Sequence, residues 1–242
     1  SAMTPTIDPN KSKSTLDSGK TSGKADSNIG ADLDQTGLIG QYDAQAVSAS
    51  DGDSKNSWND QSGEGNDLTG SNVTYRASPL NGFPALQFGE SDSMDVSFGS
   101  QPQPNTIFIV SQLQSIDATS FHDFQIDGDS SNGRQGFETD NNGRWGIYAG
   151  SDVVVGGSAD TNLHIHSILF DAGSSQVRVD GSQVLSGNPG GDTPGGLTVG
   201  ANYSDFNGAT GYFGEVLYYN QDKSGNFDAI ESFLADKWGI TL

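Results

Sequence analysis

Two carboxylates spaced two residues apart are the first candidates for chemistry in this chain. Glu138 and Asp140 lie in the run Glu138-Thr-Asp140-Asn-Asn-Gly143, and on a strand their side chains would share one face. Retaining glycoside hydrolysis uses two carboxylates about 5–5.5 Å apart. The same run also resembles the end of a hairpin, where such polar residues form the turn. The sequence therefore offers a catalytic and a structural interpretation of this pair.

The three histidines raise the possibility of a metal site. His164 and His166 would point the same way on a strand, so they could bind a metal if a third ligand came from elsewhere. His122 is the remaining histidine, and there is no cysteine. A disulfide, a zinc–thiolate site and a cysteine nucleophile are therefore excluded. We favour the interpretation that the histidine pair consists of ordinary polar strand residues.

A segment rich in oxygen ligands suggests calcium binding. In the run from Asp127 to Glu138, Asp127, Asp129 and Ser131 alternate, and Glu138 falls at the twelfth position, as in an EF-hand loop. Gly133 stands at the seventh place rather than the sixth, and the flanking residues favour strands over helices. The alternative is that these are solvated turn residues, where Asp is common because it bonds its own backbone. The predicted calcium ligands are Asp127, Asp129, Ser131 and Glu138.

Aromatic residues among polar ones could bind sugars. An aromatic ring covers the C–H face of a sugar, while amides and carboxylates nearby reach its hydroxyls. Loops at one end of a β-sandwich commonly carry such sites. The alternative for Trp145 is that it covers the sheet. The predicted ligand-binding residues are Trp145 and Tyr148 after a hairpin turn, and Asn202, Tyr203, Asp205, Phe206 and Asn207 in one loop.

Short strands are expected to position these residues. Apolar runs alternate with Gly, Asn, Asp and Ser clusters, which indicates about a dozen strands and an all-β sandwich or barrel. Hairpin turns are predicted at 140–143 and at Asp180-Gly181. The predicted strands are 38–43, 85–88, 95–98, 106–112, 122–126, 135–139, 144–148, 164–170, 176–179, 182–185, 197–199 and 214–219.

One helix is predicted near the C-terminus, at about residues 226–237. Ser224 or Asn226 could cap its start, and Gly239 could take the left-handed position past its end. Its polar residues separate apolar ones that recur at helical spacing. These apolar residues are Phe227, Ile230, Phe233 and Leu234.

Composition narrows the class of protein and of partner. The 242 residues include 33 glycines, only 32% are hydrophobic, and the net charge is −20. So acidic a surface argues against nucleic acid and anionic lipid as partners, because phosphate binding needs Lys and Arg. No stretch approaches the roughly 18 apolar residues of a membrane span, so membrane insertion is not expected. The acidity fits adaptation to high salt, a calcium-rich extracellular setting, or simple solubility.

The N-terminal stretch differs from the rest. Residues 1–3 have the composition of a cloning remnant, and residues 4–37 that of a polar linker or leader with few apolar residues. We therefore expect a division into residues 1–37 and a folded domain at 38–242.

Three blocks of the domain match the pattern of a known family. The second block is the hairpin at 163–185, and the third is the strand and helix at 211–239. The domain thereby resembles the laminin-G-like, concanavalin A-like jelly-roll domains of bacterial and archaeal surface proteins. The first block comprises Tyr42-Asp43-Ala44, the run Trp58-Asn-Asp60-Gln-Ser62-Gly63-Glu-Gly65-Asn66-Asp67, and Asn81-Gly82-Phe-Pro84-Ala-Leu86-Gln-Phe88.

The resemblance implies an all-β, two-sheet antiparallel jelly-roll sandwich with one short C-terminal helix. Glycoside hydrolases of this fold use an E-x-D-x-x-E run, and Gly143 stands here at the third carboxylate position. We therefore expect no enzyme activity. The first hypothesis is a recognition or adhesion module of a larger secreted or cell-surface protein, binding glycans or a partner surface through end loops, with calcium as a potential cofactor. The alternatives are a passive structural domain and, disfavoured, a glycoside hydrolase or lyase.

Overall fold

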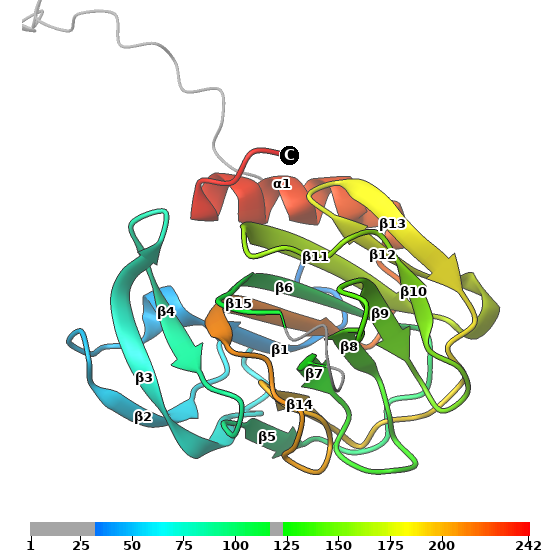
Figure 1. The fold of residues 1–242 in the computed structure, drawn as a ribbon, viewed down its shortest axis with the longest axis horizontal. Helices are drawn as coiled ribbons and strands as arrows, with labels where there is room; N and C mark the ends of the chain where they lie inside the picture. Colours follow the sequence, from blue (N-terminus) through cyan, green and yellow to red (C-terminus); the bar gives the residue numbers. More distant parts are fainter. Residues whose placement is uncertain (1–31, 117–122) are drawn as a thin grey trace, which may run out of the picture. The chain divides into compact units, whose positions relative to one another are not determined.

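The structure is a computed structural model that describes residues 32–116 and 123–242. These residues form fifteen strands, three short 3-10 turns and one α-helix (Figure 1). The 3-10 turns are η1 (Ala44–Ala46), η2 (Ala172–Ser174) and η3 (Ser224–Asn226), and the helix is α1 (Phe227–Trp238). The strands are β1 (Leu38–Asp43), β2 (Ser54–Trp58), β3 (Leu68–Leu80), β4 (Phe83–Phe88), β5 (Met94–Ser97), β6 (Asn105–Leu113), β7 (Asp123–Asp127), β8 (Gly136–Thr139), β9 (Trp145–Tyr148), β10 (Val154–Gly156), β11 (Leu163–Phe170), β12 (Ser175–Val179), β13 (Ser182–Gly187), β14 (Gly196–Val199) and β15 (Gly211–Tyr219).

The strands form one antiparallel sheet that is nearly closed. Its order is β10-β9-β8-β7-β14-β5-β3-β4-β15-β6-β11-β12-β13, with β1 on β15 and β2 on β3. The two ends of this path come together, because β10 contacts β13 (Figure 1). A Cβ added at Gly156 on β10 would lie only 2.4 Å from the carbonyl oxygen of Val184, so glycine permits this approach.

The central strands are buried on nearly every residue because both of their faces are covered. Eight of the nine residues of β6 and of β15 are buried. On β15, Phe213 packs edge-to-face against Phe88 of β4, with ring centroids 5.0 Å apart. Trp58 and Trp238 are fully buried, so these two tryptophans are packing residues.

The predicted helix is confirmed, with a different start. Its apolar face is buried, and Phe227 packs edge-to-face on Phe108 of β6. Burying each such large side chain contributes about 1.5–3 kcal/mol. Gly239 ends the helix at φ +63°, as predicted. The predicted side-chain cap is wrong: η3 precedes the helix, and the Asn226 side chain accepts no hydrogen bond from a backbone N–H of the first helical turn. Its amide NH2 donates to the Asp34 carboxylate.

Both predicted hairpin turns are confirmed. At the β8–β9 turn the backbone N–H of Asp140 donates to the carbonyl of Arg144, and Gly143 has φ +68°. At the β12–β13 turn both Asp180 and Gly181 have positive φ. Such turns match the right-handed twist of the strands that they connect.

The strand predictions missed β2, β3 and β10. The β3 segment alternates buried residues such as Val73 and Tyr75 with exposed polar ones, and its Gly, Ser and Asn residues imitate a loop. In β2 only Trp58 is buried. No residue of β10 is fully buried. The strand propensities of their residues do not reveal such strands, because pairing with neighbouring strands, rather than their own composition, stabilises them.

Asp60, in the run from Trp58 to Asp67, holds a loop together. Both carboxylate oxygens of Asp60 accept hydrogen bonds, from the backbone N–H groups of Gln41, Ser62 and Asn66. The Asn66 amide in turn donates to the carbonyl of Ile39. This block is therefore explained by structure alone.

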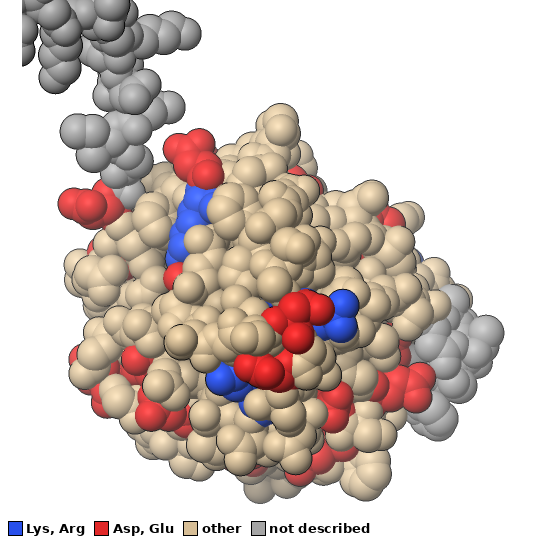
Figure 2. Space-filling view, turned by 90° about the vertical axis from the view of Figure 1, so that its left-hand side faces the viewer, with Lys and Arg blue, Asp and Glu red and all other residues tan. Residues whose placement is uncertain are grey.

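The residues just before β1 pack on the domain. Lys223 binds the Asp34 carboxylate at 2.9 Å, and the Tyr219 hydroxyl donates to the Asp34 carbonyl. Acidic side chains occur in several groups on the face shown in Figure 2, with the few basic ones beside them. Within the described ranges, no helix has the length and apolarity to cross a membrane.

Candidate functional site

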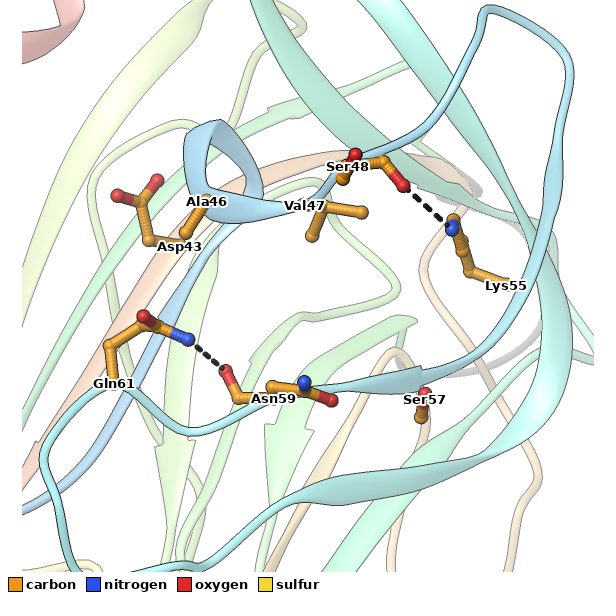
Figure 3. Close-up of a pocket in the computed structure, with 8 residues that line it drawn as sticks. All are labelled: Asp43, Ala46, Val47, Ser48, Lys55, Ser57, Asn59 and Gln61. Carbon is orange, nitrogen blue, oxygen red and sulfur yellow. Dashed lines mark hydrogen bonds between the residues drawn. The ribbon is translucent and has the colours of Figure 1, made fainter.

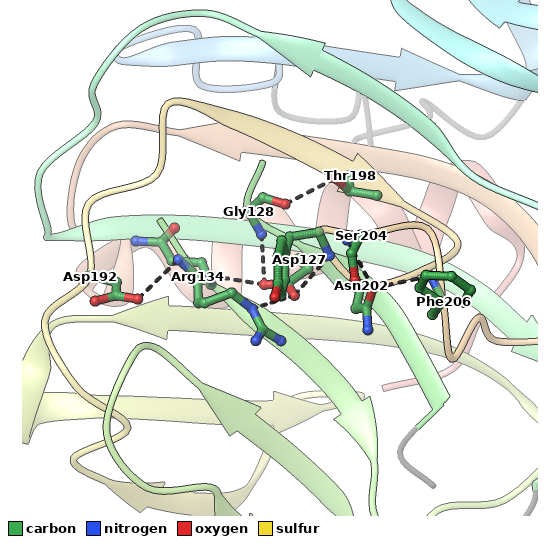
Figure 4. Close-up of polar contacts among 10 residues, drawn as sticks. Asp127, Gly128, Arg134, Asp192, Thr198, Asn202, Ser204 and Phe206 are labelled. Carbon is green, nitrogen blue, oxygen red and sulfur yellow. Dashed lines mark hydrogen bonds and ion pairs between the residues drawn. The ribbon is translucent and has the colours of Figure 1, made fainter. Parts of the chain in front are cut away.

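A buried carboxylate anchors the one arginine that stands among aromatic rings. Asp127, at the end of β7, is fully buried and lies 2.6 Å from Nε of Arg134 (Figure 4). Its oxygens also accept from the backbone N–H groups of Gly128, Gln135 and Tyr203. Burial raises the pKa of Asp127 to about 6, against the opposing effects of Arg134 and these hydrogen bonds. Above that pH the ion pair fixes the arginine in place.

Three aromatic rings surround the Arg134 guanidinium. Its central carbon lies 4.6 Å from the ring centroid of Tyr203, 4.9 Å from that of Tyr148 and 5.3 Å from that of Phe124. These distances are within the range of cation–π attraction. Nε is used by Asp127, and neither Nη atom donates to another residue in the part of the chain that the structure describes. The guanidinium thus combines fixed geometry with donors that a ligand can use.

A hollow opens beside this cluster on the outer face of β7, β8 and β9. Its volume is about 160 Å³. Two glycines shape its floor: a Cβ at Gly136 would lie 2.6 Å from the Phe124 ring, and one at Gly146 would lie 3.3 Å from Val153. We call it the Arg134 hollow, and it is lined by Phe124, Arg134, Glu138, Tyr148 and Val153.

The loop at 201–208 borders this cluster and is held by its own side chains. The Asn202 side-chain oxygen accepts from the backbone N–H groups of Ser204 and Phe206, and the Asp205 carboxylate accepts from Ser93. The N–H of Tyr203 donates to Asp127, which joins the loop to the arginine anchor. The loop is therefore fixed in position before any ligand arrives.

The predicted ligand-binding residues divide into three groups. Tyr148 and Tyr203 meet at Arg134, and Phe206 is 68% exposed on the neighbouring loop. Asn202 is nearly buried and organises the loop, as Asp205 does through Ser93. Asn207 is exposed, in a left-handed conformation with φ +54°.

Trp145 is the one aromatic residue of that set that lies inside the fold. It is only 2% exposed, stacks on Phe137 and packs edge-to-face on His166. Residues on β9 alternate between faces, so Tyr148 points outward where Trp145 points inward. The sequence-based alternative, that Trp145 covers the sheet, is the one that fits these contacts.

The four predicted calcium ligands do not meet. Asp127 is occupied by Arg134, Asp129 accepts from the N–H of Gly195, and Glu138 lies on β8 in the Arg134 hollow. Ser131 is exposed in the intervening turn. Over residues 32–116 and 123–242, no three His, Cys, Asp or Glu side chains are placed to hold one metal ion. The described residues thus give no support to the EF-hand-like site, and calcium binding stays a prediction.

The histidines and the carboxylate pair have structural partners. His164 lies between Asp180 at 2.7 Å and Asp160 at 2.9 Å. Burial lowers the pKa of His166 to about 3, so its ring is neutral in the core. Asp140 pairs with Arg144 across the β8–β9 turn. His122 lies outside the described residues.

A second hollow lies beside β2. Its volume is about 300 Å³, larger than that of the Arg134 hollow. Figure 3 shows its two walls, with the Lys55 ammonium bonded to the Ser48 carbonyl and the Gln61 amide to the Asn59 carbonyl. We call it the polar hollow, and it is lined by Asp43, Ala46, Val47, Ser48, Lys55, Ser57, Asn59 and Gln61.

Of the five residues that line the Arg134 hollow, Tyr148 was predicted as ligand-binding and Glu138 as a calcium ligand, whereas Phe124, Arg134 and Val153 were not predicted. Arg134 is one of seven basic residues after position 37, and it stands between an Asp-rich turn and an aromatic strand. That rarity is the signal that could have identified it. Phe124 has no such signal, because its outward position follows from a bulge at Gln125 between β7 and β8.

No protein-family model and no curated protein matches the sequence. Similar solved structures do exist. Trypanosoma rangeli sialidase in complex with sialic acid matches with a TM-score of 0.60 at 17% identity over 85% of this chain. This chain spans about a third of that sialidase, 34% of its length.

Two smaller structures are also similar. Domain 4 of AbnA, a GH43 extracellular arabinanase from Geobacillus stearothermophilus in complex with arabinotriose, matches with a TM-score of 0.55 at 15% identity over 75% of this chain and 91% of that domain. The binding domain of botulinum neurotoxin DC in complex with SialylT matches with a TM-score of 0.57 at 10% identity over 83% and 52%. At these identities the likeness establishes the fold alone: this chain shares the all-β architecture of these domains.

Proposed function

We propose that this protein is a non-catalytic carbohydrate-recognition module that binds a glycan at the Arg134 hollow. One observation carries the proposal: a buried ion pair fixes Arg134 among three aromatic rings, beside an open hollow. A rigid donor next to aromatic and apolar surface is the combination that a sugar needs. Stacking covers its C–H face, and directed hydrogen bonds bind its hydroxyls.

The size of the Arg134 hollow suits one sugar ring. At about 160 Å³ it is smaller than the roughly 300–1,000 Å³ of pockets that enclose drug-sized ligands. Tyr148 and Val153 offer apolar contact, and Arg134 and Glu138 offer a donor and an acceptor. Phe206, exposed on the neighbouring loop, would contact the next residue of a longer glycan or a partner surface.

The structural neighbours support the proposal by analogy. One is domain 4 of an arabinanase in complex with arabinotriose, and another is a toxin binding domain in complex with SialylT. Catalysis is disfavoured here because Asp140, the partner that the sequence offered to Glu138, is engaged by Arg144. We further infer that the fold is a concanavalin A-like jelly roll. The nearly closed antiparallel sheet supports this inference. The setting that fits is a larger secreted or cell-surface protein, as in the extracellular arabinanase.

A glycan array with matched variants tests the proposal. We expect the wild-type protein to bind at least one glycan, and Tyr148→Ala to lose most of that binding. Tyr212→Ala is the control, since that tyrosine is half-buried on β15 and accepts a hydrogen bond from Gln114. Equal binding by both variants would place the site elsewhere. If the protein binds no glycan at all, the passive structural role becomes the better explanation.

A further inference from the structure

We propose that Lys237 and Asp43 condense into an isopeptide bond within the folded chain, with Glu215 relaying the protons. The three side chains come from three elements: Asp43 ends β1, Glu215 lies on β15, and Lys237 lies in the last turn of α1. The inference is independent of the glycan-binding function, because none of these residues lines the Arg134 hollow. The ion pairs that they form are the arrangement from which the bond arises.

The reacting groups of this triad are in contact. Nζ of Lys237 lies 2.8 Å from Oδ2 of Asp43 and 2.7 Å from Oε2 of Glu215. Asp43 and Glu215 are direct partners in the register of β1 and β15, so the sheet fixes their separation. A fold that holds an amine against a carboxyl group removes most of the entropic cost of bringing the two together.

Glu215 is placed to take a proton from the amine. Its side chain is fully buried, Oε1 accepts from the Gln41 side-chain amide, and Oε2 accepts from the indole N–H of Trp238. Burial raises the pKa of Glu215, against the opposing effect of Lys237. A carboxylate whose charge is costly to bury accepts a proton more readily than an exposed one.

Lys237 starts as the ammonium. Burial disfavours its charge, but Glu215 and Asp43 outweigh burial and raise the pKa of Lys237. The reactive amine therefore forms by proton transfer to Glu215 inside the pair, and not by loss of a proton to solvent. The Lys237 side chain is only 20% exposed, and the rings of Phe233 and Trp238 lie 5.8 and 5.9 Å from Nζ. Such apolar surroundings lower the cost of turning an ion pair into a neutral pair.

The condensation needs no other reactant. Glu215 takes one proton from the ammonium, the lone pair of Nζ forms a bond to Cγ of Asp43, and the bond between Cγ and Oδ2 breaks. Two of the three ammonium protons leave with Oδ2 as one water molecule, relayed by Glu215, and the third stays on the amide nitrogen. Glu215 ends as the carboxylate that it was at the start.

The surroundings of Asp43 assist this step. The backbone N–H of Gln45 donates to Oδ1 of Asp43 at 2.8 Å, so it stabilises the negative charge that develops on this oxygen as Nζ adds. Asp43 also lines the polar hollow, which gives the released water a way out. The bond would close a loop from residue 43 to residue 237. In a chain without cysteine it is a cross-link that no disulfide supplies.

A second lysine provides an internal comparison. Nζ of Lys223 lies 2.9 Å from the Asp34 carboxylate. In the part of the chain that the structure describes, Lys223 forms no ion pair with another carboxylate, and the Asn226 amide that also contacts Asp34 cannot relay a proton. We therefore expect Lys223 to remain a free amine.

The intact mass of the purified full chain tests the proposal. We expect the wild-type protein to weigh less than its sequence by the mass of one water molecule, and its digest to contain a branched peptide that joins residues 43 and 237. Lys237→Arg should have the full mass of its sequence, because a guanidinium does not condense in this way. Lys223→Arg is the matched control and should keep the loss. A wild-type protein of full mass, or a water loss that persists in Lys237→Arg, would overturn the proposal.

Two further variants identify the reacting carbon and the proton relay. Asp43→Asn should lose ammonia in place of water, since the same carbon then carries an amide. An unchanged loss of water in this variant would place the reaction at another residue. Glu215→Gln keeps the shape of the side chain but cannot take a proton, so it should have its full mass, and a bond formed as completely as in the wild type would refute the relay. If Glu215→Gln does not fold, Asp43→Asn still decides whether the bond exists.

Discussion

The polar hollow and the Arg134 hollow differ in a way that volume does not reveal. The polar hollow beside β2 has about 300 Å³ and the Arg134 hollow about 160 Å³. In the polar hollow, Lys55 bonds to the Ser48 carbonyl, and none of the described residues that line it is aromatic. In the smaller one, a buried carboxylate holds Arg134 among three rings and leaves its Nη donors directed away from that carboxylate.

The contrast indicates that rigidity and aromatic surface, rather than size, distinguish a recognition site here. In the polar hollow, Lys55 and Gln61 bond to exposed backbone carbonyls rather than to a buried charge. Arg134 and Tyr203 are fixed in advance through Asp127. The same carboxylate therefore stabilises the fold and holds Arg134 and Tyr203 in the geometry of the site.

The largest expected effect is that of Asp127→Asn on stability. Removing one partner of a buried ion pair leaves the other charge uncompensated, so we expect a loss of about 3–5 kcal/mol in the free energy of unfolding. The counterpart in the polar hollow is Lys55→Ala, which should change that free energy by no more than about 0.5 kcal/mol. Urea unfolding of both variants measures the difference. Similar losses of unfolding free energy in the two variants would show that the Arg134 hollow is no more rigidly anchored than the polar hollow.

Next in size is the effect of Arg134→Lys on glycan affinity. Lysine keeps the charge but loses the planar group that lies against Tyr148 and Tyr203, so we expect a loss of about 1–2 kcal/mol in binding free energy. The matched change in the polar hollow, Lys55→Arg, should leave the affinity unaltered. Titration calorimetry with the best ligand from the array provides the measurement. Wild-type affinity in Arg134→Lys would show that charge alone is needed.

A smaller effect is expected from pH. Burial raises the pKa of Asp127 to about 6, so acidification below about pH 6 protonates it and releases Arg134. Affinity for a neutral glycan should therefore be constant above pH 7 and fall as the pH drops through 6. The ion pair beside the polar hollow behaves differently: burial opposes the charge of Lys237, but Glu215 outweighs it and raises its pKa. Affinity that stays constant down to pH 5 would contradict the role of Asp127 as the anchor.

Much of the fold could be predicted from the sequence because its elements carry local signals. The C-terminal helix has an apolar face of helical period and a terminal glycine, and the turn at Asp180-Gly181 has the residues that positive φ favours. The strands that were missed, such as β3, lack that signal because pairing with neighbours stabilises them. Helix, turns and strands rich in buried apolar residues were therefore predictable, whereas the polar or short strands β2, β3 and β10 were not.

The site was predictable only in part, for a different reason. Tyr148 and Tyr203 were identified by residue type, and both lie at Arg134. Trp145 was grouped with them because the sequence does not say which face of β9 lies inward. Arg134 was missed because its role depends on Asp127 and on rings from three separate segments, β7, β9 and the loop at 201–208. Long-range convergence of this kind leaves no local pattern.

The smallest expected effect concerns calcium, which the acidic composition predicted as a ligand of the loop from Asp127 to Glu138. We expect Asp129→Asn to leave unchanged any shift that 5 mM calcium produces in the thermal midpoint. The Asp129 carboxylate accepts from the N–H of Gly195, and the Asp127 carboxylate is held by Arg134, so they do not converge on one ion. A ligand bound only by the folded state must raise the midpoint. If calcium raises the thermal midpoint of the wild-type protein and Asp129→Asn abolishes that rise, calcium does bind at this loop. Calcium, rather than Arg134, would then be what holds the neighbouring surface in a fixed geometry.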